Sequence, residues 1–276
     1  MVLDIRFSTC PNDTFIFDAL VNGRVNTSPL QFRATLADID ELNAAAIQRL
    51  PDVVKVSYHA YASLVDDYVM LDAGSALGFG VGPLLVAARE VPVDRFSSLR
   101  VAIPGSLTTA AMLLNLAFPE VANTSVMLFS HIEEAVLTGE VDAGVLIHEG
   151  RFTYAAKGLV KLADLGELWE IQTGLPIPLG GIAVRRSLGT EAVKTINSLV
   201  KESALMSHAR PEAAMPYVAS FAQEMDREVM LKHIGLYVNE ATLDVGLHGR
   251  LAVRYLLNRL IPGLPSSLPV FASELD

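Results

Sequence analysis

The chain has 276 residues, of which 51% are hydrophobic and 19% are charged. This length and composition exclude a disordered segment and a small disulfide-stapled scaffold, and they predict one large domain or two smaller ones. The net charge is −10 and no stretch rich in lysine or arginine offsets it, so we expect no nucleic-acid partner.

The sequence gives only weak signals for a membrane span or for secretion. The first residues, MVLDIRFSTC, lack the apolar run of a secretory signal, and the single cysteine, Cys10, excludes an intrachain disulfide. Residues 69–88 carry one charge over a membrane-spanning length, but their glycines and Pro83 favour buried strands joined by loops. We therefore expect a cytoplasmic protein with no membrane contact.

Two strand, loop and helix segments resemble each other. The first is a strand over residues 3–7, a loop over 8–13 and a helix that starts near Thr14. The second is a strand over 99–103, a loop over 104–109 and an apolar helix over 110–117. We interpret the two segments as counterparts.

The similarity continues into a helix and a strand that follow each of these segments. A helix that opens at 38–42 leads to an apolar strand over 52–58, and a helix that opens at 131–135 leads to one over 142–148. Tyr58 and His148 each lie six residues beyond the aspartate that starts the strand, Asp52 or Asp142. This pattern indicates a degenerate internal repeat.

The alternation of strands and helices predicts an α/β fold with two mixed, mostly parallel sheets, in two lobes that face each other across a central cleft. The first lobe is expected to be discontinuous, residues 1–91 and 182–276, with a second lobe, 92–181, inserted in it. Helical periodicity continues to about residue 260, and the tail, 265–276, is expected to pack across the surface.

His148 is the first candidate for chemistry, because a neutral imidazole at the carboxyl end of a strand can accept a proton near neutral pH. Glu149 or a backbone carbonyl could orient its ring. The alternative is a hydrogen-bonded histidine with a purely structural role.

Two loops offer groups that suit a carboxylate or phosphate. In residues 105–109, backbone N–H groups and the hydroxyls of Thr108 and Thr109 precede a helix, although capping by Ser106 or Thr108 explains them equally well. In residues 8–14, Asn12 and Asp13 are capping or ligand-contacting groups. Cys10 is either a thiolate at the helix N-terminus or a small buried apolar residue.

Lys55 could supply a positive charge to an anionic ligand, and its alternative role is a surface ion pair with Asp52 or Asp66. No metal site is expected, because the histidines are widely spaced and no cysteine pair exists. Residues 78–82 resemble a dinucleotide fingerprint only superficially, since they lack its final glycine and the helix that should follow.

Taken in order, these segments and several others resemble one family over nearly the entire chain. The matching motifs are Ser8–Phe15, Lys55–Tyr58, Gly78–Pro83, Pro104-Gly105 with Thr108-Thr109, His148–Tyr154, Gly174–Gly180 and Tyr237–Gly246. Together they resemble the 1,4-dihydroxy-6-naphthoate synthases of menaquinone biosynthesis by the futalosine route.

The resemblance implies a type II periplasmic-binding-protein-like fold and a carbon–carbon lyase that uses no metal or redox cofactor. Its substrate would be a small carboxylate, cyclic dehypoxanthine futalosine, which is converted into 1,4-dihydroxy-6-naphthoate. The family's proton acceptor falls on His148, and its substrate contacts fall on Lys55, Val56 and Ser57 and on Thr108 and Thr109. Asn12 and Asp13 are further candidates for the same pocket.

Two alternatives share the expected fold. A small-anion solute-binding protein would have similar anion-binding loops, but it would normally carry an export signal and would need no histidine at the site. Chorismate dehydratase is a sister enzyme of the same pathway, in which we do not expect the motif that begins at His148. The composition of the surface does not determine an oligomeric state, so the sequence predicts none.

Overall fold

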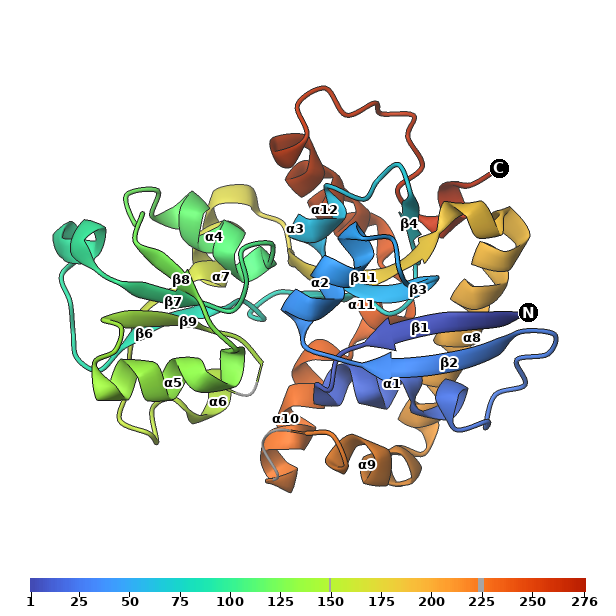
Figure 1. The fold of residues 1–276 in the computed structure, drawn as a ribbon, viewed down its shortest axis with the longest axis horizontal. Coiled ribbons are helices and arrows are strands. Elements are labelled where there is room, and N and C mark those ends of the chain that lie inside the picture. The colour runs from blue at the N-terminus through green and yellow to red at the C-terminus, as the bar shows by residue number, and fades with distance from the viewer. Residues whose placement is uncertain (149, 223–225) are drawn as a thin grey trace. The chain divides into compact units, whose positions relative to one another are not determined.

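The computed structural model describes residues 1–148, 150–222 and 226–276, and it divides into two compact units (Figure 1). Unit 1 comprises Met1–Gly78 and Pro178–Asp276, and unit 2 comprises Phe79–Ile177. The lobe boundaries expected from the sequence, 1–91 with 182–276 and 92–181, stay a prediction, and the compact units begin and end at different residues.

Unit 1 is built on a six-stranded sheet (Figure 1). The strand order is β2 (Gln31–Leu36), β1 (Val2–Phe7), β3 (Val53–Ser57), β11 (Ile177–Arg185) and β4 (Tyr68–Met70), with β5 (Ala76–Gly78) also paired to β11. Strand β1 runs parallel to both of its neighbours, whereas β11 runs antiparallel to β3 and β4. Every residue of β3 is buried, so the centre of this sheet is covered on both faces.

Helices cover both faces of this sheet. Helix α1 packs against α8, α9 and α10, and α3 packs against α12. The helices of unit 1 are α1 (Pro11–Val21), α2 (Ile39–Ile47), α3 (Tyr58–Tyr61), α8 (Thr190–Ala209), α9 (Pro211–Ala219), α10 (Arg227–Tyr237), α11 (Glu240–Leu243) and α12 (Gly246–Leu260). Alternate residues of β1, namely Leu3, Ile5 and Phe7, form one core with the buried faces of α1 and α8.

Two details of unit 1 differ from the sequence expectation. Helix α1 begins at Pro11 rather than near Thr14, because the fixed φ of proline suits the first turn of a helix. The tail does not only cross the surface: Val270 and Phe271 are fully buried, and Phe271 pairs with Met70 at the edge of the sheet. The end of α12 at Leu260 agrees with the predicted helical periodicity.

Unit 2 is built on a five-stranded sheet that repeats the pattern of unit 1. The strand order is β10 (Val160–Asp164), β6 (Leu84–Ala87), β9 (Ala143–Leu146), β7 (Val101–Ile103) and β8 (Thr124–Val126). As β1 is parallel to β2 and β3, so β7 is parallel to β8 and β9, and β6 runs antiparallel to β9 and β10. Both sheets are therefore mixed, as expected from the sequence, but half of each is antiparallel where mostly parallel pairing was expected.

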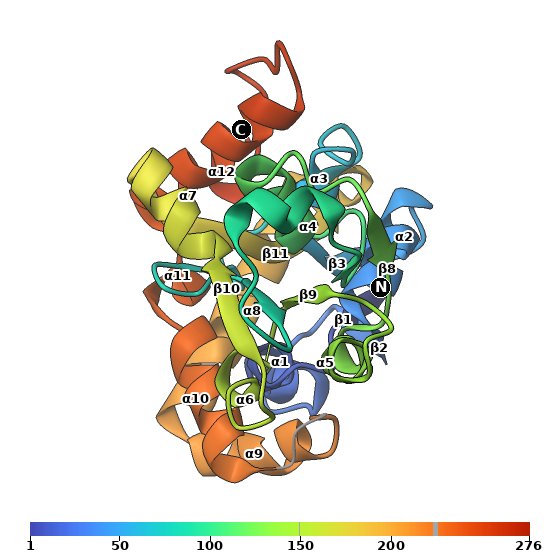
Figure 2. The same ribbon diagram turned by 90° about the vertical axis from the view of Figure 1, so that its left-hand side faces the viewer.

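The helices of unit 2 lie in two layers on either side of this sheet (Figure 2). Helices α4 (Thr109–Ala117) and α7 (Leu165–Thr173) cover one face, and α5 (Phe129–Thr138) and α6 (Gly150–Thr153) lie on the other. Ile132, Ala135 and Val136 of α5 form the core of that second face with residues of the strands. No helix in the described parts of the chain is long and apolar enough to cross a membrane.

Gly180 lies on β11 directly against the end of β3. A Cβ atom added at Gly180 would lie 2.8 Å from the backbone oxygen of Val56, and backbone cannot move aside as a flexible side chain can. We expect Gly180→Ala to lower the free energy of unfolding by about 1–3 kcal/mol, as overpacking does. Urea-induced unfolding measures the change.

Gly235→Ala is the matched control, because Gly235 lies within α10 and a Cβ there would meet nothing within 4 Å. Alanine suits a helix better than glycine by up to about 1 kcal/mol, so this variant should be as stable as the parent or more stable. Equal stability of the two variants would contradict the steric explanation for Gly180.

Candidate functional site

In unit 1, the loop that follows β1 is organised around the carboxylate of Asp13. The Ser8 hydroxyl donates to Asp13 Oδ2 at 2.7 Å, and the Asn12 side-chain amide donates to Asp13 Oδ1 at 2.8 Å. Asp13 is almost fully buried, as is Cys10 at the N-cap position of α1. The carboxylate therefore binds groups of the protein itself and fixes the shape of the loop.

Lys55 of β3 completes this cluster. Its Nζ donates to Asp13 Oδ1 at 2.7 Å and to the Gly74 carbonyl at 3.2 Å. The two charged side chains are only 5% and 2% exposed, so the expected alternative of a surface ion pair with Asp52 or Asp66 is wrong. The reason is the parallel pairing of β1 with β3, which buries β3 completely and brings the loop after β1 to Lys55.

An ammonium group carries three hydrogens, and these two acceptors take two of them. Asp13 is the counter-ion of Lys55 and holds its ammonium in one place. Within the described parts of the chain, these two bonds leave one N–H of Lys55 that can donate to a further oxygen.

Ser57 ends β3 and is held by Asn43 of α2. The Asn43 amide donates to Ser57 Oγ at 3.2 Å, and the Ser57 backbone N–H donates to Asn43 Oδ1 at 3.0 Å. Because Ser57 Oγ accepts a bond, its own proton can be donated elsewhere. The sequence analysis missed Asn43, although a polar residue on the buried face of α2, beside Leu42 and Ala46, was a signal for it.

Two further buried groups support this part of unit 1. The Tyr58 hydroxyl lies 2.7 Å from Ser75 Oγ, and burial raises the pKa of Tyr58, so the phenol stays protonated. His233 of α10 is fully buried, with Nε2 2.9 Å from Asn12 Oδ1. From the sequence, His233 is only one of the widely spaced histidines, because a separation of 221 positions along the chain hides its contact with Asn12.

In unit 2, Thr108 is the N-cap residue of α4. Its hydroxyl donates to the Gly105 carbonyl at 2.7 Å and accepts the Ala111 N–H at 3.2 Å. Ser106, the other capping candidate, is exposed, while Thr109 is buried as the first residue of the helix. The Thr108 hydroxyl thus serves the helix terminus, where it caps one of the backbone N–H groups of the first turn.

His148 follows β9 at the same edge of the sheet as this loop, because β7 and β9 are parallel. It has φ +53°, a left-handed conformation that few residues other than glycine adopt, and its side chain is half-buried. The rings of Phe129 and His148 form an edge (T-shaped) contact, with their centroids 4.9 Å apart and their planes at 68° to each other. Phe129 therefore limits the rotation of the imidazole. Glu149 lies outside the described residues.

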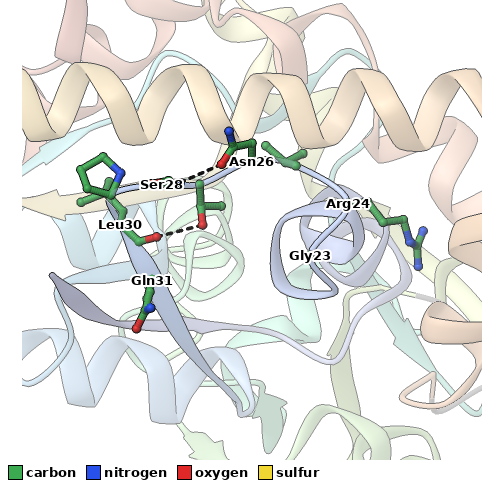
Figure 3. Close-up of a pocket in the computed structure, with 9 residues that line it drawn as sticks. Gly23, Arg24, Asn26, Ser28, Leu30 and Gln31 are labelled. Carbon is green, nitrogen blue, oxygen red and sulfur yellow. Dashed lines mark hydrogen bonds between the residues drawn. The ribbon is translucent and has the colours of Figure 1, made fainter.

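A surface hollow of about 530 Å³ lies elsewhere in unit 1, over residues 23–31 between α1 and β2 (Figure 3). Two hydrogen bonds within the loop shape it: Thr27 Oγ1 donates to the Leu30 carbonyl, and the Ser28 N–H donates to Asn26 Oδ1. Arg24 points away from these groups and pairs with Asp18 (Figure 3). The hollow contains none of the candidate residues, and we assign it no chemistry.

The sequence matches a known protein family and two related enzymes over nearly its whole length. The profile of a family described as "Menaquinone biosynthesis" matches residues 3–261. The 1,4-dihydroxy-6-naphthoate synthase of Streptomyces coelicolor is 48% identical over 272 residues, which cover 95% of each chain. The enzyme of the same name from Thermus thermophilus is 46% identical over 273 residues, which cover 98% of each.

The chain belongs to the 1,4-dihydroxy-6-naphthoate synthase family of menaquinone biosynthesis. It is therefore a lyase that acts on a small-molecule substrate, and the resemblance stated from the sequence motifs is confirmed.

The fold of this naphthoate synthase is also found in solute-binding proteins. The alkanesulfonate-binding protein SsuA of Xanthomonas axonopodis pv. citri superposes with a TM-score of 0.66 and 12% identity, covering 98% of this chain and 96% of that one. At this identity the likeness shows the type II periplasmic-binding-protein-like fold alone, as expected from the sequence. Membership of the synthase family separates the chain from both alternatives, the solute-binding protein and chorismate dehydratase.

Within each unit of the naphthoate synthase, the fold gathers the candidate residues at one edge of a sheet. Asn12 and Lys55 both donate to Asp13, and Ser57 ends the same strand that carries Lys55. Val56 lies between Lys55 and Ser57 on β3, so its side chain points to the opposite face of the strand. Only the backbone of Val56 is on the same side as those two side chains. Among the residues that the structure describes, no three His, Cys, Asp or Glu side chains are arranged to hold a metal ion.

The buried Lys55–Asp13 pair in the naphthoate synthase can be tested by breaking it. Asp13→Leu leaves a buried ammonium without its counter-ion, which typically costs about 3–5 kcal/mol of unfolding free energy. Adding Lys55→Met should restore much of that loss, since two apolar side chains then replace the pair. Glu228→Ala, which breaks the exposed pair with Lys232, is the control and should leave the stability almost unchanged, because water screens that pair. A double variant no more stable than Asp13→Leu would contradict the role of the pair.

The capping role of Thr108 in the naphthoate synthase gives a separate prediction. Thr108→Val removes the hydroxyl that accepts the Ala111 N–H, so thermal or urea unfolding should report a loss of about 0.5–2 kcal/mol. Thr108→Ser keeps the cap and should restore the stability. If Thr108→Val unfolds like the parent protein, the cap contributes nothing.

Proposed function

We propose that the enzyme converts cyclic dehypoxanthine futalosine into 1,4-dihydroxy-6-naphthoate, with His148 as the base that accepts a proton from the substrate. The observation that carries the assignment to His148 is its imidazole, half-buried at the carboxyl end of β9 and held edge-on by Phe129. The ring is half-buried as a whole with its Nε2 atom shielded from water, and its packing against Phe129 restricts it to few orientations. Both properties suit a general base.

The reaction requires a base because a proton must leave the substrate before the bond to the sugar-derived ring can break. The electron pair of that carbon–carbon bond then enters the ring system that becomes the naphthalene, and the sugar-derived carbons depart. Formation of the aromatic system supplies the driving force. A neutral imidazole accepts a proton near neutral pH more readily than any other ordinary side chain.

For substrate binding in unit 1, we propose Lys55 and Ser57 as hydrogen-bond donors to the carboxylate or ring oxygens of the substrate. Support comes from the third N–H of Lys55 and from the hydroxyl proton of Ser57, whose positions Asp13 and Asn43 fix. Val56 would take part through its backbone. Asp13 and Asn12 would then act by holding Lys55 rather than by touching the substrate.

For substrate binding in unit 2, we propose the first turn of α4, at Thr108 and Thr109. The backbone N–H groups of a helix N-terminus attract anions, and this contribution does not require the Thr108 hydroxyl, which is occupied by the cap. We propose further that the reaction takes no metal or redox cofactor and that the enzyme acts in the cytoplasm. Activity in the presence of a chelator and cell fractionation test these two points.

The decisive experiment compares the parent protein with His148→Asn. Asparagine is the best replacement because it tolerates the left-handed backbone of this position and cannot accept a proton as imidazole does. We expect turnover of cyclic dehypoxanthine futalosine, measured as naphthoate by mass spectrometry without added metal, to fall by about 10²-fold or more. Substrate binding and thermal stability should change little.

His131→Asn is the matched control, since His131 lies on α5 of the same unit and is exposed. It should turn over like the parent protein. Near-normal turnover by His148→Asn would overturn its role as the base. No product from the parent protein would overturn the proposed substrate.

A further inference from the structure

The segment that follows His148 is anchored to the rest of unit 2 by Arg151. The guanidinium of Arg151 donates to the Gly82 carbonyl and, at 2.9 Å, to Asp164 Oδ2. The side chains of the ion pair are only 16% and 11% exposed, so they are far better shielded from water than a surface pair. The family motif from His148 to Tyr154 contains Arg151, but neither the reaction nor the substrate contacts account for it.

The two groups that Arg151 binds are themselves fixed. Asp164 is the N-cap residue of α7, where its other oxygen, Oδ1, accepts the N–H groups of Gly166 at 3.0 Å and Glu167 at 3.1 Å. Gly82 is in backbone contact with Gly166, because a Cβ added at Gly82 would lie 2.3 Å from the Gly166 Cα. Arg151 therefore anchors its own segment to the junction of β6, β10 and α7, where the backbone is closely packed.

The same segment is held on its other side by α5. Glu133 of α5 accepts a bond from Lys157 and, at 3.4 Å, one from the Thr153 hydroxyl. Helix α5 also begins with Phe129, whose ring meets that of His148. The segment after His148 therefore has two anchors, one through Glu133 and one through Arg151.

His148 needs such support because its backbone is strained. A non-glycine residue with φ near +53° costs free energy, and the surrounding structure must hold it there. The Arg151 N–H lies 3.4 Å from the His148 carbonyl, so the residue whose side chain is anchored also closes the turn at His148.

We propose that Arg151 is a positioning residue, which holds the backbone turn at His148 so that the imidazole is aimed for proton transfer. This inference rests on the proposed role of His148 as the base. Arg151 does not itself exchange a proton with the substrate, because a guanidinium stays protonated in proteins. Its loss should therefore affect the chemical step more than substrate binding.

Two variants remove the anchor in different ways. Arg151→Ala deletes the guanidinium. Asp164→Asn is more selective, because it keeps the capping oxygen for Gly166 and Glu167 and replaces only the oxygen that binds Arg151. The second variant preserves the test if the first folds poorly.

Arg100→Ala is the matched control for both. Arg100 also pairs with an aspartate, Asp142, and donates to the Gly139 and Glu140 carbonyls, and its hydrogen bond lowers the pKa of Asp142. It lies at the opposite end of β9 from His148. Its loss should lower thermal stability without changing kcat.

We expect kcat to fall by about 10- to 100-fold in Arg151→Ala and by a smaller factor in Asp164→Asn, with KM within about threefold of the parent value. In the double variant Arg151→Ala with His148→Asn, the loss should be no greater than for His148→Asn alone, because positioning has no effect once the base is gone. Parent kcat in both anchor variants, or losses that multiply in the double variant, would overturn the proposal.

The same measurements separate this inference from the proposed function. Full turnover by His148→Asn would remove the base assignment and the positioning role with it. Loss of turnover in His148→Asn, together with parent kcat in Arg151→Ala and Asp164→Asn, would keep His148 as the base and overturn only the role of Arg151.

Discussion

The parallel pairing of β1 with β3 is the constraint on which the candidate site of unit 1 depends. It brings the loop after β1 beside the buried middle of β3, so that the carboxylate of Asp13 meets the ammonium of Lys55 where water is excluded. A buried pair of this kind is held only if the remaining hydrogen-bonding capacity is also satisfied. Ser8, Asn12 and the Gly74 carbonyl do this, and Asn12 extends the network to His233 on α10.

The same strand arrangement recurs in unit 2 with different residues at the strand ends. Where β3 leads to Tyr58, fully buried and bonded to Ser75, β9 leads to His148, half-buried and in a left-handed conformation. The same strand pattern therefore ends in a buried tyrosine in one unit and in a histidine with a strained backbone in the other. The strain at His148 is matched by contacts on both sides of its segment, which is how rigid surroundings maintain an unfavourable backbone conformation.

This arrangement explains how a fold shared with solute-binding proteins can serve a lyase. The sheets and their anion-attracting helix termini suffice for binding a carboxylate, and proteins that only bind need no more. In the proposed function, the additional element is the imidazole of His148 as proton acceptor, held by its neighbours instead of by the ligand. Positioned groups of this kind accelerate a reaction because their orientation is paid for when the protein folds.

The sequence by itself determined the α/β class, the repeat and the family, because these depend on the local alternation of apolar residues and on short motifs read along the chain. It also determined that Lys55 and Ser57 belong to one strand and that His148 follows another. Only the tertiary structure decided the partners: Lys55 with Asp13 instead of Asp52 or Asp66, Asn43 with Ser57, His233 with Asn12, and Arg151 with Asp164. The antiparallel half of each sheet and the burial of Phe271 were decided there as well. The physical reason is that these contacts join residues far apart in the sequence, so they depend on strand order and packing rather than on any local pattern of residues.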